Sequence, residues 1–367
     1  MNNIIKEKNK TFLKYIINIR RSKITYIVLL LAIAPRVIWM TKDVMPDSNL
    51  FEFSVKLNFN NFINNLGFTK SLIIKLLSVS WLFILITFFE FIKSKNIRNL
   101  SISRINYSKG GKYADLIYYI LSLFEFKLSY LTYFATLGIS SFSGSFRSFL
   151  NKVYENLVPI DFFSNSFTIF FMFILGLLIF ELGQYISHRL SHAYFWEVHE
   201  FHHSATEMNI LNVNRTGPLH QAINGLIDLP FVLLGVVFVN QSIVQGQWAI
   251  FILWTIFGIA GECFGFIGHS SLKLIFPKPI SYIFLSPSLH WLHHSDNPKH
   301  FNKNFGRVLC IWDQIFGTYL DESNLKDIKG FGFKHSAYNK YNPLYCYYIL
   351  PVKKLLQRKL KINFRYP

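Results

Sequence analysis

Histidine is the residue type whose distribution in this sequence most clearly indicates chemistry. The chain contains 12 histidines, and all of them lie between His188 and His335. Most fall into three compact boxes, HRLSH at 188–192, HEFHH at 199–203 and HWLHH at 290–294. Neutral imidazole is a ligand that suits iron, zinc or copper, so this clustering predicts a metal site.

The spacing inside each box is that of one face of a helix. Residues three or four positions apart on an α-helix lie on the same side, with Cβ atoms about 6 Å apart. The box histidines, which we predict to be ligands, are His188, His192, His199, His202, His203, His290, His293 and His294. One ion does not take this many ligands, so the boxes indicate two metal ions close together.

Other residues of ligand type lack such a pattern. His300 and His335 stand in polar stretches, and we expect ordinary hydrogen-bonded or surface roles for them. The cysteines, Cys263, Cys310 and Cys346, form no CxxC pair, so neither a disulfide framework nor a thiolate metal site is predicted.

Composition places the histidine boxes in a membrane protein. Hydrophobic residues make up 51% of the chain, 39 residues are Phe, and the mean hydropathy is +0.28. The formal charge of +18 comes from short Lys and Arg runs beside apolar stretches. Such runs bind anionic lipid headgroups, and no nucleic-acid reading motif accompanies them, so we predict a membrane and no nucleic acid as partner.

Apolar segments near the length needed to cross a roughly 30 Å hydrocarbon core recur along the chain. The segments are 24–40, 72–92, 116–142, 167–186, 223–239 and 248–267. Arg36 interrupts the first, Glu125 and Lys127 interrupt the third, and the last two resemble a helical hairpin. The basic loop 93–112 is expected on the cytoplasmic side, which places both termini and the histidine boxes there as well.

These elements predict an all-α fold, an integral membrane helical bundle of about six membrane segments with a cytoplasmic, histidine-rich helical cap. We divide the chain into an N-terminal membrane region of unknown role at 1–166, a catalytic domain at 167–320 and a basic C-terminal tail at 321–367.

The order HRLSH, HEFHH and HWLHH, flanked by apolar hairpins, resembles the fatty acid hydroxylase superfamily, which includes sterol desaturases and alkylglycerol monooxygenases. The resemblance covers about 167–320. Flanking residues that agree with it are Glu181, Tyr185, Ser204, Asn209, Arg215, Asn304, Phe305, Gly306, Trp312, Asp313, Phe316, Gly317 and Thr318.

The resemblance extends the ligand set beyond the boxes. Gly268-His269 resembles the family's additional histidine, which makes His269 a predicted ligand. Family members often carry Arg-x-His-Pro where this chain reads Arg215-Thr-Gly-Pro218, and His220 is the candidate replacement for the missing histidine.

Three charged residues are expected to support the ligands. Glu181 lies seven residues before the first box and is expected to fix a ring tautomer, or else to face headgroups at a helix end. Arg215 and Asp313 are expected to support the site or to tie loops down.

The resemblance implies a membrane enzyme with two iron ions that uses O2 to hydroxylate or desaturate a lipid. The chain has no Gly-rich dinucleotide fingerprint and no CxxCH haem attachment, so we expect electrons from a separate donor of the cytochrome b5, ferredoxin or reductase type.

Two alternatives come from other functional classes. The stretch 199–203 also satisfies HExxH, the zinc metalloprotease pattern, with Glu200 as general base. A histidine-rich metal transporter is the other alternative, and it should carry ionisable residues along a path through its spans.

Overall fold

The computed structural model describes residues 17–18, 80–92, 100, 113–124, 165–333 and 335–360. The predicted apolar segment 24–40 lies outside the described residues, as do the greater parts of 1–166 and of the predicted third segment. The described residues are mostly helical, and their sheet content is a two-residue parallel pairing of β1 (Ile17–Asn18) with β2 (Leu272–Lys273).

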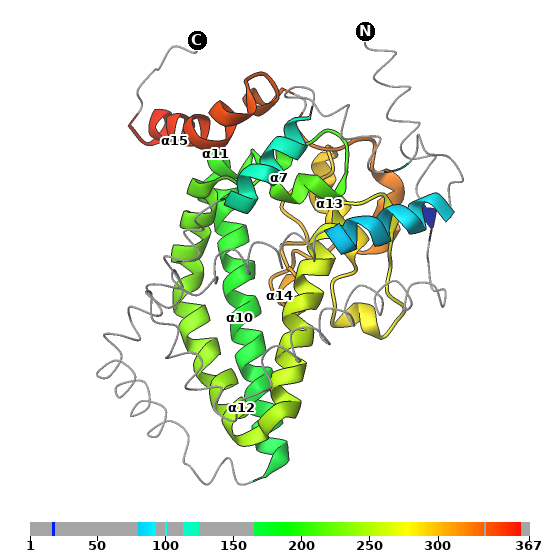
Figure 1. Cartoon of the computed structure of the whole chain (residues 1–367), viewed down its shortest axis with the longest axis vertical. Helices are drawn as coiled ribbons and strands as arrows, with labels where there is room; N and C mark the ends of the chain where they lie inside the picture. The colour runs from blue at the N-terminus through cyan, green and yellow to red at the C-terminus, as the bar shows by residue number, and fades with distance from the viewer. Residues whose placement is uncertain are drawn as a thin grey trace.

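The central element is α10 (Ser166–Tyr194), which runs through the middle of the bundle in Figure 1. The Asn165 side chain caps its start by accepting a hydrogen bond from the Thr168 amide. Within the described residues, α10 is the one helix both long and apolar enough to cross a membrane. One of the predicted membrane segments is therefore supported by length and composition, and the predicted number of about six is not.

The long helical segment α12 (Pro218–Gly268) folds back on itself and covers α10 with two legs (Figure 1). Phe180 of α10 lies against the Gly235 backbone on one leg and in edge contact with Trp254 on the other, at a ring-centroid distance of 5.7 Å. A straight helix of this length could not place both residues against one side chain. The legs have the hairpin arrangement expected for 223–239 and 248–267.

Short helical elements form a cap at the carboxyl end of α10 (Figure 1). The cap carries Trp291, Leu292 and Met208 in its apolar core, all fully buried. Its elements are α11 (Trp196–His199), η4 (His202–Ser204), η5 (Ile210–Asn214), η6 (Ile280–Tyr282), η7 (Pro287–Leu289), α13 (His290–His293), η8 (Pro298–His300), α14 (Ile311–Ile315) and η9 (Glu322–Asp327). The helix Ser80–Ile92 contributes Leu82 and Ile86 to a separate buried cluster, which it shares with Ile267 of α12.

The C-terminal elements pack against the cap. They are η10 (Ala337–Asn339), the π-helical η11 (Tyr345–Ile349) and α15 (Leu350–Leu360), and they share a buried cluster with α7 (Ala114–Phe124). In this cluster the Tyr118 and Phe201 rings meet edge to face, with centroids 4.8 Å apart, and Tyr118 stacks on Tyr347. Residues 337–350, which follow the predicted boundary at 320, therefore pack against Phe201 of the cap and against α7.

Candidate metal centre

The three boxes and His269 converge at the carboxyl end of α10, which itself carries His188 and His192. Each histidine offers one ring nitrogen, and within a group these nitrogens all lie within 4.8 Å of one another. The first group comprises His188, His192, His199, His203 and His293, and the second comprises His202, His269, His290 and His294. The structure thus brings together every predicted ligand except His220, in two neighbouring groups.

Sequence neighbours divide between the two groups. His203 belongs to the first group and the adjacent His202 to the second, while His293 belongs to the first and the adjacent His294 to the second. The His203 and His294 rings stack with centroids 4.4 Å apart, so the two groups adjoin each other. The arrangement fits two sites side by side better than one large site.

The distances between ring nitrogens fit metal ligands. His203 Nε2 lies 3.1 Å from His192 Nε2 and 3.1 Å from His199 Nε2. In the second group, His294 Nε2 lies 2.9 Å from His290 Nε2. Nitrogens bound at right angles to one ion, each about 2.1 Å from it, lie about 3 Å apart.

Backbone carbonyls orient two of the first-group rings. The carbonyl of Phe305 lies 2.8 Å from His188 Nδ1, and that of Lys303 lies 2.9 Å from His293 Nδ1. A carbonyl only accepts, so each Nδ1 carries the proton and each Nε2 keeps its lone pair. The buried Nε2 of His293 has no hydrogen-bond partner among the described residues, as expected of an atom reserved for a metal.

Burial keeps the cap histidines neutral. Desolvation, followed by the charges of neighbouring histidines, lowers the pKa of His199, His203 and His294 well below the usual value. Desolvation also lowers the pKa of His269 to about 3. Imidazole binds a metal through its neutral form, so the site is poised for ligation at neutral pH.

Glu181 and Asp313 contact the backbone of the loop 305–309 and not a histidine ring. Asp313 accepts hydrogen bonds from the amides of Phe305 and Gly306, both at 2.8 Å. Glu181 accepts from the amides of Val308 and Leu309, both at 3.0 Å. Together they hold the loop that brings the Phe305 carbonyl to His188. The expectation that Glu181 itself fixes a ring tautomer is therefore corrected.

Arg215 ties the second box to neighbouring elements. Its guanidinium forms a buried ion pair with Asp115 of α7 at 2.6 Å and donates to Ser204 Oγ at 2.8 Å. Ser204 directly follows His203, so Arg215 supports the turn that carries two ligands. Asp115 was not singled out from the sequence. The sequence feature that could have identified Asp115 is its position as the single acidic residue at the start of an apolar helix.

His220 lies behind His199, outside both groups. Its Nε2 is 2.8 Å from His199 Nδ1 and 3.1 Å from the side-chain nitrogen of Asn224, whose oxygen accepts from Ser191 Oγ at 2.6 Å. An amide nitrogen only donates, so His220 Nε2 accepts from both neighbours. His199 then keeps its proton on Nδ1 and presents Nε2 to the first group. This placement reassigns His220 from ligand to hydrogen-bond partner of a ligand.

Glu200 faces away from the histidine groups. Its carboxylate pairs with Lys354 of α15 and accepts from Ser336 Oγ at 2.6 Å. A metalloprotease needs this glutamate at the metal-bound water. His199 and His203 moreover share their group with three further histidines. The geometry gives Glu200 a structural position instead.

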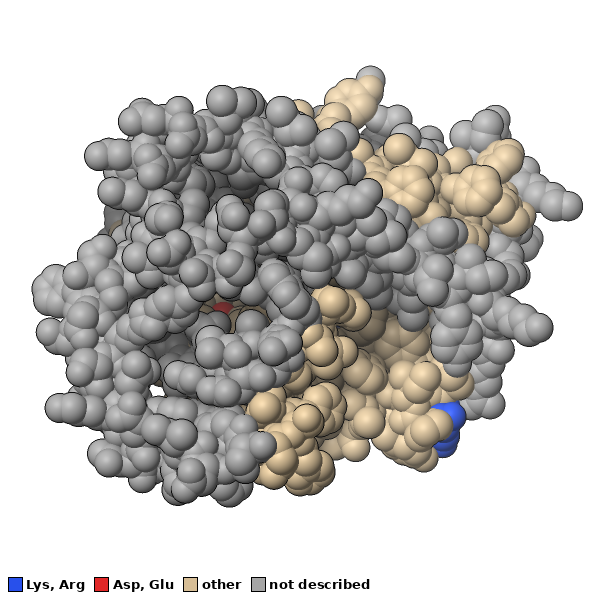
Figure 2. All heavy atoms as spheres, turned by 60° about the horizontal axis from the view of Figure 1, so that its bottom comes forward, with Lys and Arg blue, Asp and Glu red and all other residues tan. Residues whose placement is uncertain are grey.

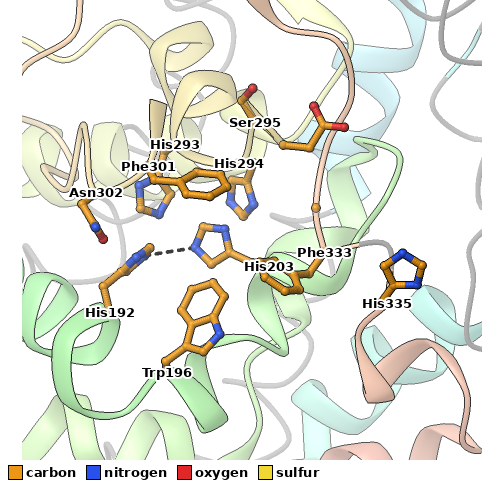
Figure 3. A pocket seen from close by; sticks show the side chains of 12 residues that line it. His192, Trp196, His203, His293, His294, Ser295, Phe301, Asn302, Phe333 and His335 are labelled. Carbon is orange, nitrogen blue, oxygen red and sulfur yellow. Dashed lines mark hydrogen bonds between the residues drawn. The ribbon is translucent and has the colours of Figure 1, made fainter. Parts of the chain in front are cut away.

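Two cavities adjoin the groups on different sides. One of about 280 Å3 lies between α10 and the two legs of α12, with His188, His202 and Gly265 in its wall. The other, of about 530 Å3, opens beside His203 in the cap and is shown in Figure 3. His335, expected to be an ordinary surface residue, lies at this second cavity.

A strap formed by 330–333 closes the cap beside the second and third boxes. The Gly332 amide donates to the carbonyl of His294, and the Phe333 amide donates to that of His203, both at 2.9 Å. Gly332 has φ +67°, and a Cβ there would lie 2.0 Å from the Ala205 carbonyl oxygen. Glycine is required by this close approach.

The described residues form a helical protein with two largely buried, all-histidine groups of metal-binding type at the carboxyl end of an apolar helix. Residues 173–318 match the family model described as fatty acid hydroxylase. The resemblance inferred from the boxes is thereby confirmed.

Curated relatives match part of the chain. The chain is 32% identical over 161 residues to the ornithine lipid hydroxylase OlsE of Rhizobium tropici, covering 43% of this chain and 44% of that protein. It is 32% identical over 140 residues to the alkylglycerol monooxygenase of Caenorhabditis elegans, covering 38% of this chain and 25% of that protein. It is 29% identical over 145 residues to the alkylglycerol monooxygenase of Homo sapiens, covering 39% of this chain and 29% of that protein. The match thus spans less than half the length of these relatives. No solved structure matches the chain.

Proposed function

We propose that this chain is a membrane-bound, oxygen-dependent oxidoreductase that holds two iron ions and hydroxylates or desaturates a lipid. The observation that carries the proposal is the pair of adjoining histidine groups, five residues and four, buried at the end of α10. The family match and relatives named for a lipid hydroxylase and an alkylglycerol monooxygenase support a lipid as the substrate class.

Iron held by the two groups would supply the oxidising power that an unactivated C–H bond requires. The protein's own part is positional. The Phe305 and Lys303 carbonyls keep His188 and His293 in the tautomer that leaves Nε2 available, and His220 does the same for His199. Burial keeps the rings neutral, the form that binds a metal.

Electrons would come from a separate protein of the cytochrome b5, ferredoxin or reductase type, as inferred from the sequence. An apolar substrate would reach His188 and His202 through the cavity between α10 and the α12 legs, whose wall contains both residues.

A membrane location is supported by the outer surface of α10. Phe167, Phe170 and Phe171 near its start are 77%, 48% and 52% exposed. On the face shown in Figure 2, the described side chains are almost all uncharged. We propose that this end lies in the bilayer and that the cap and both termini are cytoplasmic.

The test is metal and product analysis of protein purified without oxygen. We expect two irons per chain by elemental analysis, a di-iron Mössbauer signature, and incorporation of 18O from 18O2, or double-bond formation, in an extracted lipid after reduction. His203→Ala and His293→Ala should each lose most of the bound iron and the activity.

Glu200→Gln is the matched control within the second box. Because Glu200 faces Lys354, this variant should retain iron and lipid oxidation. One zinc per chain, together with a peptidase activity abolished by Glu200→Gln, would instead establish a metalloprotease.

A further inference from the structure

The smaller cavity, between α10 and the two legs of α12, has both apolar and amide side chains in its wall. Val213, Phe264 and Leu285 line it, and so do Gln184 and Asn224. A polar group among apolar ones is costly unless it is hydrogen-bonded. The hydrogen bonds of the two amides therefore show what a ligand in this cavity has to supply.

The two amides differ in how completely their hydrogen bonds are used. Asn224 donates to His220 Nε2 at 3.1 Å, and its oxygen accepts from Ser191 Oγ at 2.6 Å. Gln184 donates to Asp228 Oδ2 at 2.7 Å, but none of the described residues donates to its side-chain oxygen. Gln184 is partly buried. It therefore contributes an unused hydrogen-bond acceptor to the wall of the cavity.

Asp228 determines which way the Gln184 amide points. It lies on the first leg of α12, within the predicted membrane segment 223–239, and is 9% exposed. An ionised carboxylate only accepts, so the NH2 group of Gln184 faces Asp228 and the amide oxygen is turned away from it. An acid in an apolar segment of membrane length is costly and is usually kept for a function.

The wall contains donors of its own, but they leave the amide oxygen without a partner. The Ser187 hydroxyl donates to the Gln184 backbone carbonyl at 3.2 Å. Thr216 and Arg307 also line the cavity, and neither donates to the Gln184 side chain. A ligand group that only accepts, such as an ester, would not serve the amide oxygen. A hydroxyl or an N–H group would supply the missing hydrogen bond.

Resting on the proposed function, we infer that Gln184 is a specificity-determining residue for the lipid and that Asp228 is its positioning residue. The Gln184 oxygen accepts a hydrogen bond from an O–H or N–H group of the lipid. Gln184 and His188 lie four residues apart on one face of α10, with Cβ atoms about 6 Å apart. The carbon that is oxidised therefore lies within a few bonds of that hydroxyl or amide group.

The inference is tested by binding rather than turnover. Iron-loaded protein in a neutral maltoside detergent is incubated, without reductant, with tritiated methyl hexadecanoate. Unlabelled methyl hexadecanoate and N-methylhexadecanamide, which differ only in an ester oxygen against an N–H group, compete for the site. Scintillation proximity counting gives both affinities. We expect the amide to bind about fivefold to tenfold more tightly than the ester, which corresponds to one additional hydrogen bond.

Three variants locate the site. Gln184→Met removes the amide at similar volume and should abolish the preference while leaving the affinity for the ester unchanged. Asp228→Asn should reduce the preference, because an asparagine can donate as well as accept and no longer fixes the Gln184 amide. Gln314→Met is the matched control. Its amide also donates, to the Tyr282 carbonyl at 2.7 Å, but it lies outside the cavity, so this variant should keep the preference.

Equal affinities for the amide and the ester would overturn the inference, because water would then serve the Gln184 oxygen. A preference that survives Gln184→Met would overturn it as well, as would an equal loss of both lipids, which would indicate a structural role. An unchanged preference in Asp228→Asn would overturn the positioning role. None of these outcomes affects the iron content or the 18O result of the unaltered protein, so failure of this inference is distinguishable from failure of the proposed oxidoreductase.

Discussion

At the scale of single residues, the site depends on which nitrogen of each ring carries the proton. Carbonyl oxygens settle this for His188 and His293, and the Ser191–Asn224–His220 chain settles it for His199. Partners of this kind hold a ligand's lone pair toward its metal before the metal arrives.

Replacing His220 with Ala should therefore weaken the first metal site without removing a ligand. We expect about 10-fold to 100-fold weaker binding of one of the two irons, as is typical when a ligand's hydrogen-bond partner is lost. Competition with a chelator of known affinity, followed by elemental analysis, measures it. His335→Ala, a histidine outside both groups, is the control. Equal loss of both irons, or none, would contradict the assigned role.

Sequence spacing identified the histidines that the structure brings together, but not their hydrogen-bond partners. Spacing of three and four identified the box histidines because helical periodicity places such residues on one side. Spacing could not show that His220 contacts Nδ1 of His199 and not the metal-facing Nε2, because tertiary packing decides which ring nitrogen a neighbouring residue contacts. Glu181 and Asp313 were recognised as supporting residues. Their actual partners are backbone amides of 305–309, and contacts to backbone amides cannot be predicted from side-chain types.

At the scale of elements, the strap 330–333 joins the second and third boxes. Gly332→Ala should destabilise the cap severely, because it combines a φ of +67° with a Cβ placed 2.0 Å from a carbonyl oxygen. We expect a loss of about 3 kcal/mol or more, against about 1 kcal/mol for Gly317→Ala, where φ is +70° but the space is open. Thermal unfolding of both variants separates the backbone strain, which both carry, from the steric clash, which only Gly332→Ala adds. Equal losses of stability would contradict the close approach at Gly332.

The ion pair between Arg215 and Asp115 fixes α7 to the turn of the second box. Arg215→Met leaves a carboxylate buried without its cation and should cost about 3–5 kcal/mol. Adding Asp115→Asn should restore part of that stability, since the stranded charge is then removed. Denaturant unfolding of the two single variants and the double variant measures the coupling. Additive losses would show that the pair does not interact.

Contacts between helices far apart in the sequence were harder to predict than the helices themselves. Periodicity and length identified α10 and the hairpin of α12, because apolar segments of membrane length are visible in composition. The contact of α7 and α15 with the second box was not foreseen. Basic residues dominate the sequence at 353–365, whereas the packing depends on Tyr118, Tyr338 and Tyr347.

At the scale of the whole molecule, the buried neutral histidines make stability depend on pH. An unfolded histidine titrates near 6.5, whereas burial lowers the pKa of His269 to about 3 and those of His199, His203 and His294 well below normal. Below about pH 6.5 the unfolded chain takes up protons that the folded chain does not, so stability falls as pH falls.

Metal-free protein should therefore melt at a clearly lower temperature at about pH 5 than at about pH 8. Iron-loaded protein should show a steeper decline over the same range, because protons also compete for the ligand nitrogens. Scanning calorimetry in matched detergent measures both. A melting temperature independent of pH in the metal-free protein would show that the histidines are solvated rather than buried.

The division of His202 from His203, and of His293 from His294, has a consequence for how such a chain can change over time. At two separate places in the chain, two successive residues contribute one ring to each histidine group. Inserting or deleting a single residue at either doublet would exchange rings between the two groups instead of disturbing one group alone. Length changes should therefore accumulate in the long intervals between the boxes, and the two groups should be kept or lost together in evolution.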